Sequence, residues 1–318
     1  MVQSRRITVF CNILLLAVAM IWGFCFLFQK DCSASIGPGT FMMVRYFLSA
    51  LTILPFIIFL EKKKKPDDRI KYDKHSVVRL IKLSAVLAVF QMINMLLNQG
   101  GIAYTTASKA AFLTATYMVM VPIFSLLLFK GKTPVMGWIG SIIGIIGIYF
   151  LSITGDFSIN IGDLMIIGSS IFAATHFLLL QKLIQTIDGK HFICVEFFIA
   201  AVYCSFICFF IEKPSLSDLV ECMDSLLIAS ILGGGICYML MVTAQKYTDP
   251  TIAALIMSLE SLFGAIAGVI FMGDTFTGRE IFGAALLTFA VMISQLKPRN
   301  RIVLKVKYKS DEVQNGTK

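Results

Sequence analysis

Long uncharged apolar runs alternate with short polar stretches along almost the whole chain. A helix needs roughly 20 mostly apolar residues to cross a bilayer, and each run is about that long. The pattern therefore predicts ten membrane-spanning helices. Their predicted ranges are 9–28, 39–60, 77–98, 108–129, 135–153, 161–181, 191–211, 225–245, 251–272 and 279–296. Most connections are short, so consecutive helices are expected to be antiparallel neighbours.

A helix–turn–helix pattern that begins near Tyr104 occurs a second time. A shift of 143 residues brings Tyr104 onto Tyr247 and Gly140 onto Gly283. An internal repeat changes the whole fold assignment, because each copy is a structural unit. The predicted units are a first repeat at 9–153, a second repeat at 161–296 and a cytoplasmic tail at 297–318.

Each predicted repeat contains an odd number of spans, so the second must be inserted upside down relative to the first. Inverted repeats are a common ground plan of secondary transporters, with the substrate site near the midplane between the halves. The predicted fold class is therefore an all-α integral membrane protein with ten transmembrane helices in two inverted five-helix repeats.

Composition supports the membrane assignment. The 318 residues are 57% hydrophobic and 15% charged, with a mean hydropathy of +0.82. A soluble domain carries about 25% charged residues. The net charge of +9 does not indicate a nucleic-acid partner, because the basic residues gather in loops and in the tail.

The distribution of Lys and Arg predicts the orientation. With the N-terminus in the cytoplasm, the external segments hold only Lys30, Lys213 and Arg279. Such an excess of positive charge on one side marks the cytoplasmic face. We expect a multi-pass protein of the plasma or inner membrane with both termini in the cytoplasm. The first apolar run reaches Phe28 without a small-residue cleavage site, so it is expected to be retained as a helix.

Several short motifs resemble a known family. They are Ile21-Trp22-Gly23, Arg45-Tyr46-Phe47-Leu48, the stretch from Ala103 to Phe112, Val121-Pro122 and Ser258-Leu259-Glu260. Together they resemble the EamA repeat of the drug/metabolite transporter superfamily, over about 9–296. The chain differs at Ser261-Leu262, where many relatives have Pro after the Glu, and at Lys130-Gly131, where many first repeats carry an acid. The resemblance implies a carrier that exports amino acids, other metabolites or drugs.

Ionisable groups inside a span are costly and usually face a cavity or a partner. Glu260 lies near the middle of the ninth predicted span, and the 143-residue shift pairs it with Tyr117 in the fourth. This pairing predicts two polar groups near the pseudo-symmetry axis, where a substrate would bind. The alternatives are a structural hydrogen bond for Glu260 and a local one for Tyr117.

Two basic residues are further candidates for substrate binding. Arg45, in the outer third of the second span, could attract a substrate carboxylate or could bond backbone carbonyls at a helix end. Lys109, at the outer end of the fourth span, would extend to the lipid headgroups or, if that helix opens into a cavity, would line it.

The third span carries a polar stripe. Gln91, Asn94 and Asn98 are spaced i, i+3 and i+7, so they share one helix face. Such a stripe lines a pathway or bonds a neighbouring helix, and we favour the pathway.

His176, within a predicted span, could accept a proton in coupled transport or could be structural. Trp22 beside a cavity would suit an apolar substrate, although a position in the core or facing lipid is the alternative. Glu196 is expected near the cytoplasmic interface. The consecutive glycines 233–235 predict either a hinge or a tight helix crossing, since glycine weakens a helix by about 1 kcal/mol relative to Ala.

Motifs for other classes of protein are missing from the sequence. It has no H-E-x-x-H zinc helix, no G-x-S-x-G elbow and no phosphate-binding Gly loop. We therefore expect no enzyme activity, no catalytic residues, no metal and no cofactor. The expected partners are a small-molecule substrate and the lipid bilayer, with no nucleic acid. A multidrug or lipid-type exporter of the same fold and a non-transporting receptor or scaffold remain alternatives. The oligomeric state and the pairing of Cys32 with Cys222 stay open.

Overall fold

A computed structural model describes residues 2–65, 72–105, 107–130, 133–152, 159–272 and 277–296. Within these ranges every regular element is helical. The α-helices are α1 (Val2–Ser35), α2 (Pro38–Lys63), α3 (Lys74–Tyr104), α4 (Ala107–Ala115), α5 (Tyr117–Phe129), α6 (Val135–Ser152), α7 (Ile161–Leu183), α8 (Gly189–Ile207), α9 (Leu216–Glu221), α10 (Met223–Ile228), α11 (Cys237–Gln245), α12 (Pro250–Met257), α13 (Glu260–Ala267) and α14 (Gly278–Ser294). The π-helical segments are η2 (Cys208–Glu212), η3 (Ala229–Ile236) and η4 (Gly268–Met272).

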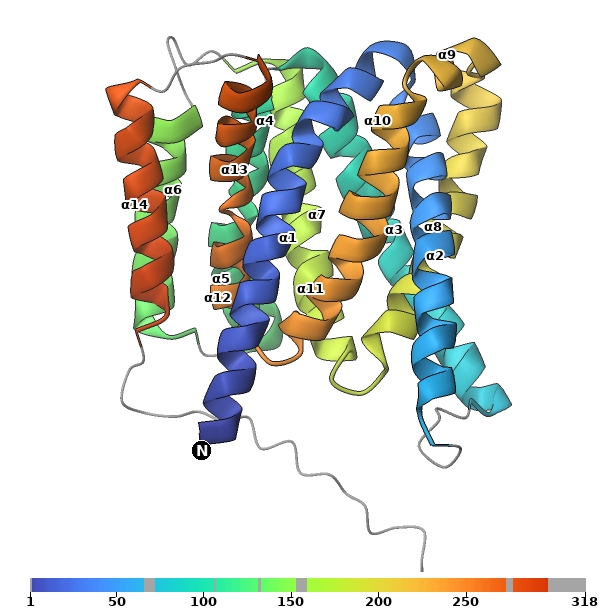
Figure 1. The fold of residues 1–318 in the computed structure, drawn as a ribbon, viewed down its shortest axis with the longest axis horizontal. Coiled ribbons are helices and arrows are strands. Elements are labelled where there is room, and N and C mark those ends of the chain that lie inside the picture. Colours follow the sequence, from blue (N-terminus) through green and yellow to red (C-terminus); the bar gives the residue numbers. More distant parts are fainter. Residues whose placement is uncertain are drawn as a thin grey trace, which may run out of the picture.

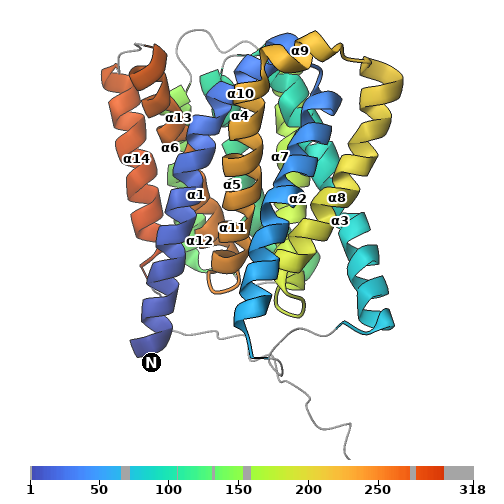
Figure 2. The same ribbon diagram turned by 45° about the vertical axis from the view of Figure 1, so that its right-hand side comes forward.

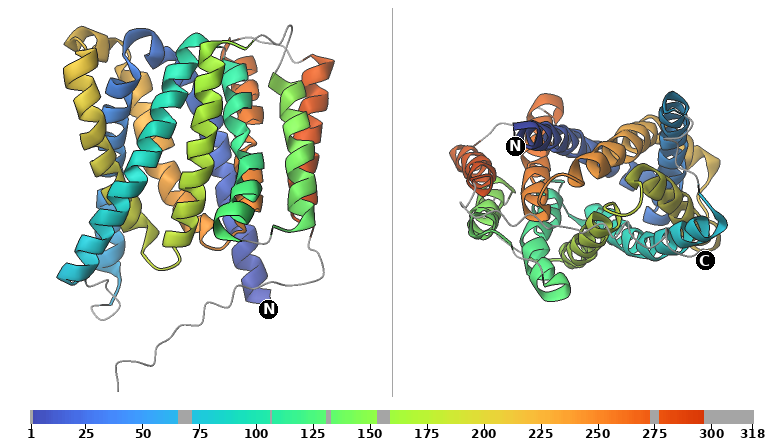
Figure 3. Two further views of the ribbon diagram at one scale, coloured as in Figure 1. Left: turned by 180° about the vertical axis from the view of Figure 1, so that it is seen from behind. Right: turned by 90° about the horizontal axis from the view of Figure 1, so that it is seen from below.

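The long helices stand side by side as one bundle (Figures 1 and 2). At one edge α6 packs against α14, and at the other edge α2 packs against α8 (Figure 1). Between these pairs, α1 contacts α11, α12 and α13 on one face. Seen from behind, α3 and α7 lie against each other on the opposite face (Figure 3).

Within the described part of the chain, eight helical stretches are long and apolar enough to cross a membrane. They correspond to eight of the ten predicted spans, so the prediction of an all-α integral membrane protein is confirmed at this level. The other two predicted spans, 135–153 and 279–296, form the shorter helices α6, of 18 residues, and α14, of 17 residues. That these two also cross the bilayer remains a prediction.

Local sequence explains where several helices begin. The first turn of a helix leaves backbone N–H groups without partners, and a side chain can accept their hydrogen bonds. Asn160 and Asp163 form a reciprocal capping box at the start of α7, and Thr277 and Glu280 form one at the start of α14. Each capping box fixes the residue at which its helix starts.

The glycines 233–235 make a tight crossing between η3 and α2. A Cβ atom on Gly234 would clash with Ser49, and a Cβ on Gly235 would lie 2.7 Å from Thr52. Ser49 Oγ also donates a hydrogen bond of 2.9 Å to the Ser230 carbonyl. The structure therefore favours close packing over the hinge that the sequence also allowed.

Cys32 and Cys222, whose pairing the sequence leaves open, lie close together. Cys32 lies in α1, because that helix extends to Ser35, and Cys222 lies between α9 and α10. Both thiols are free and buried. The Cys32 thiol is 3.8 Å from the Cys222 carbonyl oxygen, so the two residues are neighbours at this end of the bundle.

Candidate functional site

A cavity lies in the interior of the bundle. Its empty space, including the part open to solvent, is about 720 Å3. The helices α1, α2, α3, α4, α5, α7, α11, α12 and α13 contribute to its wall. The lining residues are Trp22, Phe26, Gln29, Arg45, Gln91, Asn94, Met95, Asn98, Thr114, Tyr117, Ala173, His176, Phe177, Tyr238, Met241, Met257 and Glu260.

The structure brings almost all of the predicted site residues to this one cavity. The predicted residues among its lining are Trp22, Arg45, Gln91, Asn94, Asn98, Tyr117, His176 and Glu260. The exception is Lys109, which lies in α4 and whose side chain falls outside the described residues. That these residues bind a substrate remains a prediction.

Two interrupted helices meet at the cavity. The first helix is interrupted at Thr116, between α4 and α5. The second is interrupted at Ser258 and Leu259, between α12 and α13. At each break a backbone N–H bonds three residues back, from Thr116 to Leu113 at 3.3 Å and from Leu259 to Ile256 at 3.2 Å. Tighter turns of this kind often mark functional positions in a helix.

A hydroxyl group reinforces each break. Thr116 Oγ1 donates to the Leu113 carbonyl at 2.6 Å, and Ser258 Oγ donates to the Leu255 carbonyl at 2.8 Å. A hydroxyl group that donates to the backbone carbonyl three residues earlier competes with the backbone N–H that would bond to this carbonyl in a regular helix. The residue after each break is the beginning of a new helix, and those two residues are Tyr117 and Glu260.

The two interrupted helices also bond each other reciprocally. Tyr117 Oη donates to the Ala254 carbonyl at 3.4 Å, and Ser261 Oγ donates to the Ala111 carbonyl at 3.1 Å. Ala111 and Ala254 are separated by the same 143 residues that separate Tyr117 from Glu260. The contact between these helices therefore follows the sequence repeat.

One basic and one acidic side chain line the cavity without pairing with each other. Arg45 is 5% exposed and donates one hydrogen bond, of 3.3 Å, to the Gln29 side chain. Glu260 is also 5% exposed, and its carboxylate forms no hydrogen bond or ion pair with any described residue. A charge at membrane depth is costly unless something compensates it. Both groups are thus available to a ligand in the cavity.

Neutral polar groups on the cavity wall are held by neighbouring helices. Gln91 Nε2 donates to Tyr238 Oη at 2.6 Å, and Asn98 Nδ2 donates to Thr114 Oγ1 at 2.7 Å. Trp22 Nε1 donates to the Gly233 carbonyl at 2.8 Å, which orients the indole towards the cavity that it lines. These bonds fix the polar stripe of α3 in place while leaving part of each side chain open to the cavity.

His176 carries the one ion-pair contact at the cavity wall within the described chain. Its Nε2 lies 2.6 Å from Glu196 Oε1, on α8. Glu196 is fully buried among neighbouring helices, and its predicted position near the cytoplasmic interface remains a prediction. A carboxyl group within an apolar run needs a partner at any depth, and His176 on α7 supplies it.

Several lining residues were missed by sequence reasoning. Gln29, Thr114 and Tyr238 each bond a predicted site residue. Thr114 is a polar residue within an apolar run, which is the signal that identified Gln91, whereas Gln29 lies just beyond the first predicted span. The apolar lining residues, such as Phe26 and Met257, have no signal of their own, because the spans contain many Phe and Met residues.

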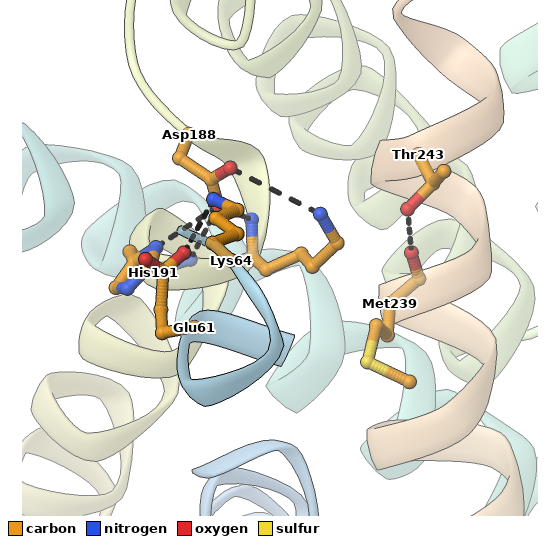
Figure 4. A network of polar contacts seen from close by, with 7 residues as sticks. Glu61, Lys64, Asp188, His191, Met239 and Thr243 are labelled. Carbon is orange, nitrogen blue, oxygen red and sulfur yellow. Dashed lines mark hydrogen bonds and ion pairs between the residues drawn. The ribbon is translucent and has the colours of Figure 1, made fainter. Parts of the chain in front are cut away.

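A second polar cluster lies outside the cavity, where α2 ends and α8 begins (Figure 4). Asp188 accepts hydrogen bonds from the backbone N–H of Lys190 at 3.0 Å and from His191 Nδ1 at 3.0 Å. Burial alone would raise the pKa of Asp188, but the His191 hydrogen bonds and the Lys190 charge outweigh it and hold the pKa well below its usual range. This cluster caps α8, and none of these hydrogen bonds joins it to a residue of the cavity lining.

Long apolar helices around a polar cavity are compatible with a membrane transporter, and sequence comparison supports this class. The chain belongs to the EamA-like transporter family, which it matches over residues 9–153 and 160–295. The predicted resemblance to this family is therefore confirmed.

Similar proteins extend the comparison. An uncharacterized transporter of Archaeoglobus fulgidus is 28% identical over 281 residues, which is 88% of this chain and 84% of that protein. An uncharacterized transporter of Clostridium kluyveri is 23% identical over 273 residues, which is 82% of this chain and 84% of that protein. A protein crystal structure with 11% identity superposes with a TM-score of 0.72, over 90% of this chain and 98% of that chain, and this likeness shows the fold alone.

Proposed function

We propose that the protein is a secondary transporter that exports a small zwitterionic metabolite, such as an amino acid, by alternating access. The observation that carries the proposal is that Arg45 and Glu260, both buried, line one cavity and have no charged partner among the described residues. A zwitterion compensates both charges at once, with its carboxylate at Arg45 and its ammonium group at Glu260. A ligand of a single charge would leave one of them uncompensated, which is costly in a site with little water.

The rest of the wall suits the uncharged part of such a molecule. Trp22, Phe26, Met241 and Met257 are apolar or aromatic, whereas Gln91 and its neighbours on α3 offer amides. A mostly apolar pocket with a few well-placed polar groups is typical of small-molecule sites. An amino acid with an apolar side chain would satisfy both kinds of wall.

The proposed mechanism uses ten membrane-spanning helices in two inverted halves. Support comes from the matched breaks before Tyr117 and Glu260 and from the reciprocal bonds to Ala254 and Ala111. In many secondary transporters, broken helices of two inverted repeats form the substrate site, and one half rocks against the other. The proposed orientation places both termini in the cytoplasm, because Lys and Arg gather in the segments on that side.

Counterflow in proteoliposomes tests the proposal. Vesicles are loaded with one unlabelled compound and exposed to the same compound labelled, over a panel of amino acids, nucleosides, cationic drugs and lipids. We expect uptake for amino acids and its loss in Glu260→Gln. Glu280→Gln is the matched control, because Glu280 caps α14 outside the cavity.

Other outcomes select another function. Uptake of cationic drugs or lipids without amino acids would favour the multidrug or lipid-type exporter. The absence of uptake for every class, with folded protein, would favour a receptor or scaffold.

A further inference from the structure

A buried carboxyl group stands directly behind the cavity wall. Glu196, on α8, is 0% exposed, and its Oε1 lies 2.6 Å from Nε2 of His176. The other oxygen, Oε2, is buried without a hydrogen-bond partner in the described part of the chain. His176 itself lines the cavity, and no described residue bonds its Nδ1. The imidazole is therefore the only described link between Glu196 and the cavity.

Proton balance makes this pair a two-state element. With a neutral imidazole donating from Nε2, the pair carries a net charge of −1. A proton added at Nδ1 gives an imidazolium and a carboxylate, whose net charge is zero. Oε2 of Glu196 has no hydrogen-bond partner among the described residues. The state with a net charge of −1 is therefore costly, because the buried carboxylate then has no positive charge to offset it.

We propose that His176 and Glu196 form the proton-binding site that couples proton movement to substrate movement. This inference rests on the proposed transport function. The proton enters from the cavity, binds His176 Nδ1, and leaves the same atom when the cavity opens to the other side. No other co-reactant is needed. Glu196 acts as a positioning residue, since it touches the cavity only through His176.

The surroundings link this site to the substrate site. The titratable and charged groups around the pair and across the cavity are Arg45 and Tyr46 on α2, Tyr238 on α11, Tyr117 on α5 and Glu260 on α13. Helix α3 contributes the neutral amides Gln91 and Asn94. A protonated pair places a positive imidazolium in the same small cavity as a substrate ammonium group. Proton and substrate binding therefore oppose each other, which is the relation that exchange of one for the other requires.

Proton binding is measured first, without a substrate. Purified wild-type protein and Glu196→Gln, in weakly buffered detergent, are titrated between pH 5 and 8 with a pH-indicator dye. We expect the wild type to bind one more proton than Glu196→Gln, because the neutral amide removes the negative charge that the added proton balances. Equal proton binding in the two proteins would overturn the proposal. This result does not depend on transport.

Proteoliposomes then test the coupling. With the membrane potential clamped, an imposed pH gradient should drive wild-type accumulation of the labelled substrate, and addition of substrate should evoke proton flux. In Glu196→Gln both effects should disappear while counterflow at equal pH persists. His176→Gln should lose the response to the pH gradient as well. Gradient-driven accumulation in Glu196→Gln that equals the wild type would refute coupling at this site.

The two proposals fail differently. A wild type that shows counterflow without substrate-evoked proton flux is a transporter whose coupling does not involve this pair. A wild type that shows no counterflow refutes the transport function, and the detergent titration still decides whether the pair binds a proton.

Discussion

Replacing Gly23 with Ala tests the packing that brings α1 against α13 beside Glu260. A Cβ atom at this position would lie 2.6 Å from the Glu260 carbonyl oxygen, 2.6 Å from Phe263 Cβ and 2.7 Å from the Gly264 nitrogen. Ordinary contacts between carbon atoms are about 3.5–4.0 Å. Two of these three atoms belong to the backbone, so the helices must separate by roughly 1 Å to admit the methyl group.

Overpacking of this kind costs about 1–3 kcal/mol. For a chain of this size we expect Gly23→Ala to lower the apparent Tm by about 2–6 °C, taking about 2 °C per kcal/mol. All eight cysteines are free and buried, so a dye that fluoresces on reaction with thiols reports unfolding in detergent. Because the backbone of Glu260 must move, counterflow should fall as well.

The matched control is Gly278→Ala, at the start of α14. A Cβ there meets nothing within 4 Å, so its Tm should stay within about 1 °C of the wild type. If Gly23→Ala has the same Tm as Gly278→Ala and the wild type, the close approach of α1 to α13 is refuted.

Two further predictions concern helix ends outside the cavity. Asp188→Ala should cost about 1 kcal/mol, because Asp188 accepts from the backbone N–H of Lys190 and of His191, whereas Asp188→Asn keeps the cap. The pKa of Asp188 is lowered, so its charge stabilises the fold above the ordinary Asp pKa of about 3.9, and this advantage of the wild type over Asp188→Asn is lost as pH falls through the folded pKa. A difference in Tm that is constant from pH 7 down to pH 3 would contradict this assignment. Glu212→Ala should cost about 1–2 kcal/mol, since Glu212 accepts from the backbone N–H of Gly39 and Thr40, each at 2.7 Å, at the start of α2. Glu212→Gln should lose less, and equal melting of the two variants in thermal unfolding would argue against the cap.

The fold was predictable because its main signal is physical and local. A bilayer requires long apolar helices, and the chain shows them as uncharged runs. The apolar runs did not predict how far each helix extends or where a helix is interrupted. The first predicted span ends at Phe28 but α1 continues to Ser35, and neither Thr116 nor Ser258, where two helices are interrupted, is a Gly or a Pro. At both breaks a hydroxyl group donates to a backbone carbonyl. The helix propensity of a single residue does not determine whether such a bond forms.

The cavity was predictable where a residue was out of place in its run. Arg45, Glu260 and the amides of α3 are costly in lipid, so each had to face a partner or a cavity. The same rule applied to Glu196, but its partner, His176, lies on a different helix and was not predicted. Pairing between helices depends on tertiary packing, which the order of residues along one chain does not reveal.

The most direct test of the central claim is equilibrium binding at the cavity. The chain has two tryptophans, and Trp138→Phe leaves Trp22, which lines the cavity, as the single reporter. Titration with the transported compound should change Trp22 fluorescence to saturation. Glu260→Gln in the same background should weaken binding by about 30-fold or more, since loss of one partner of a buried charge pair costs about 2–5 kcal/mol. A transported compound that leaves Trp22 emission unchanged, or that binds Glu260→Gln as tightly, would contradict a substrate site in this cavity.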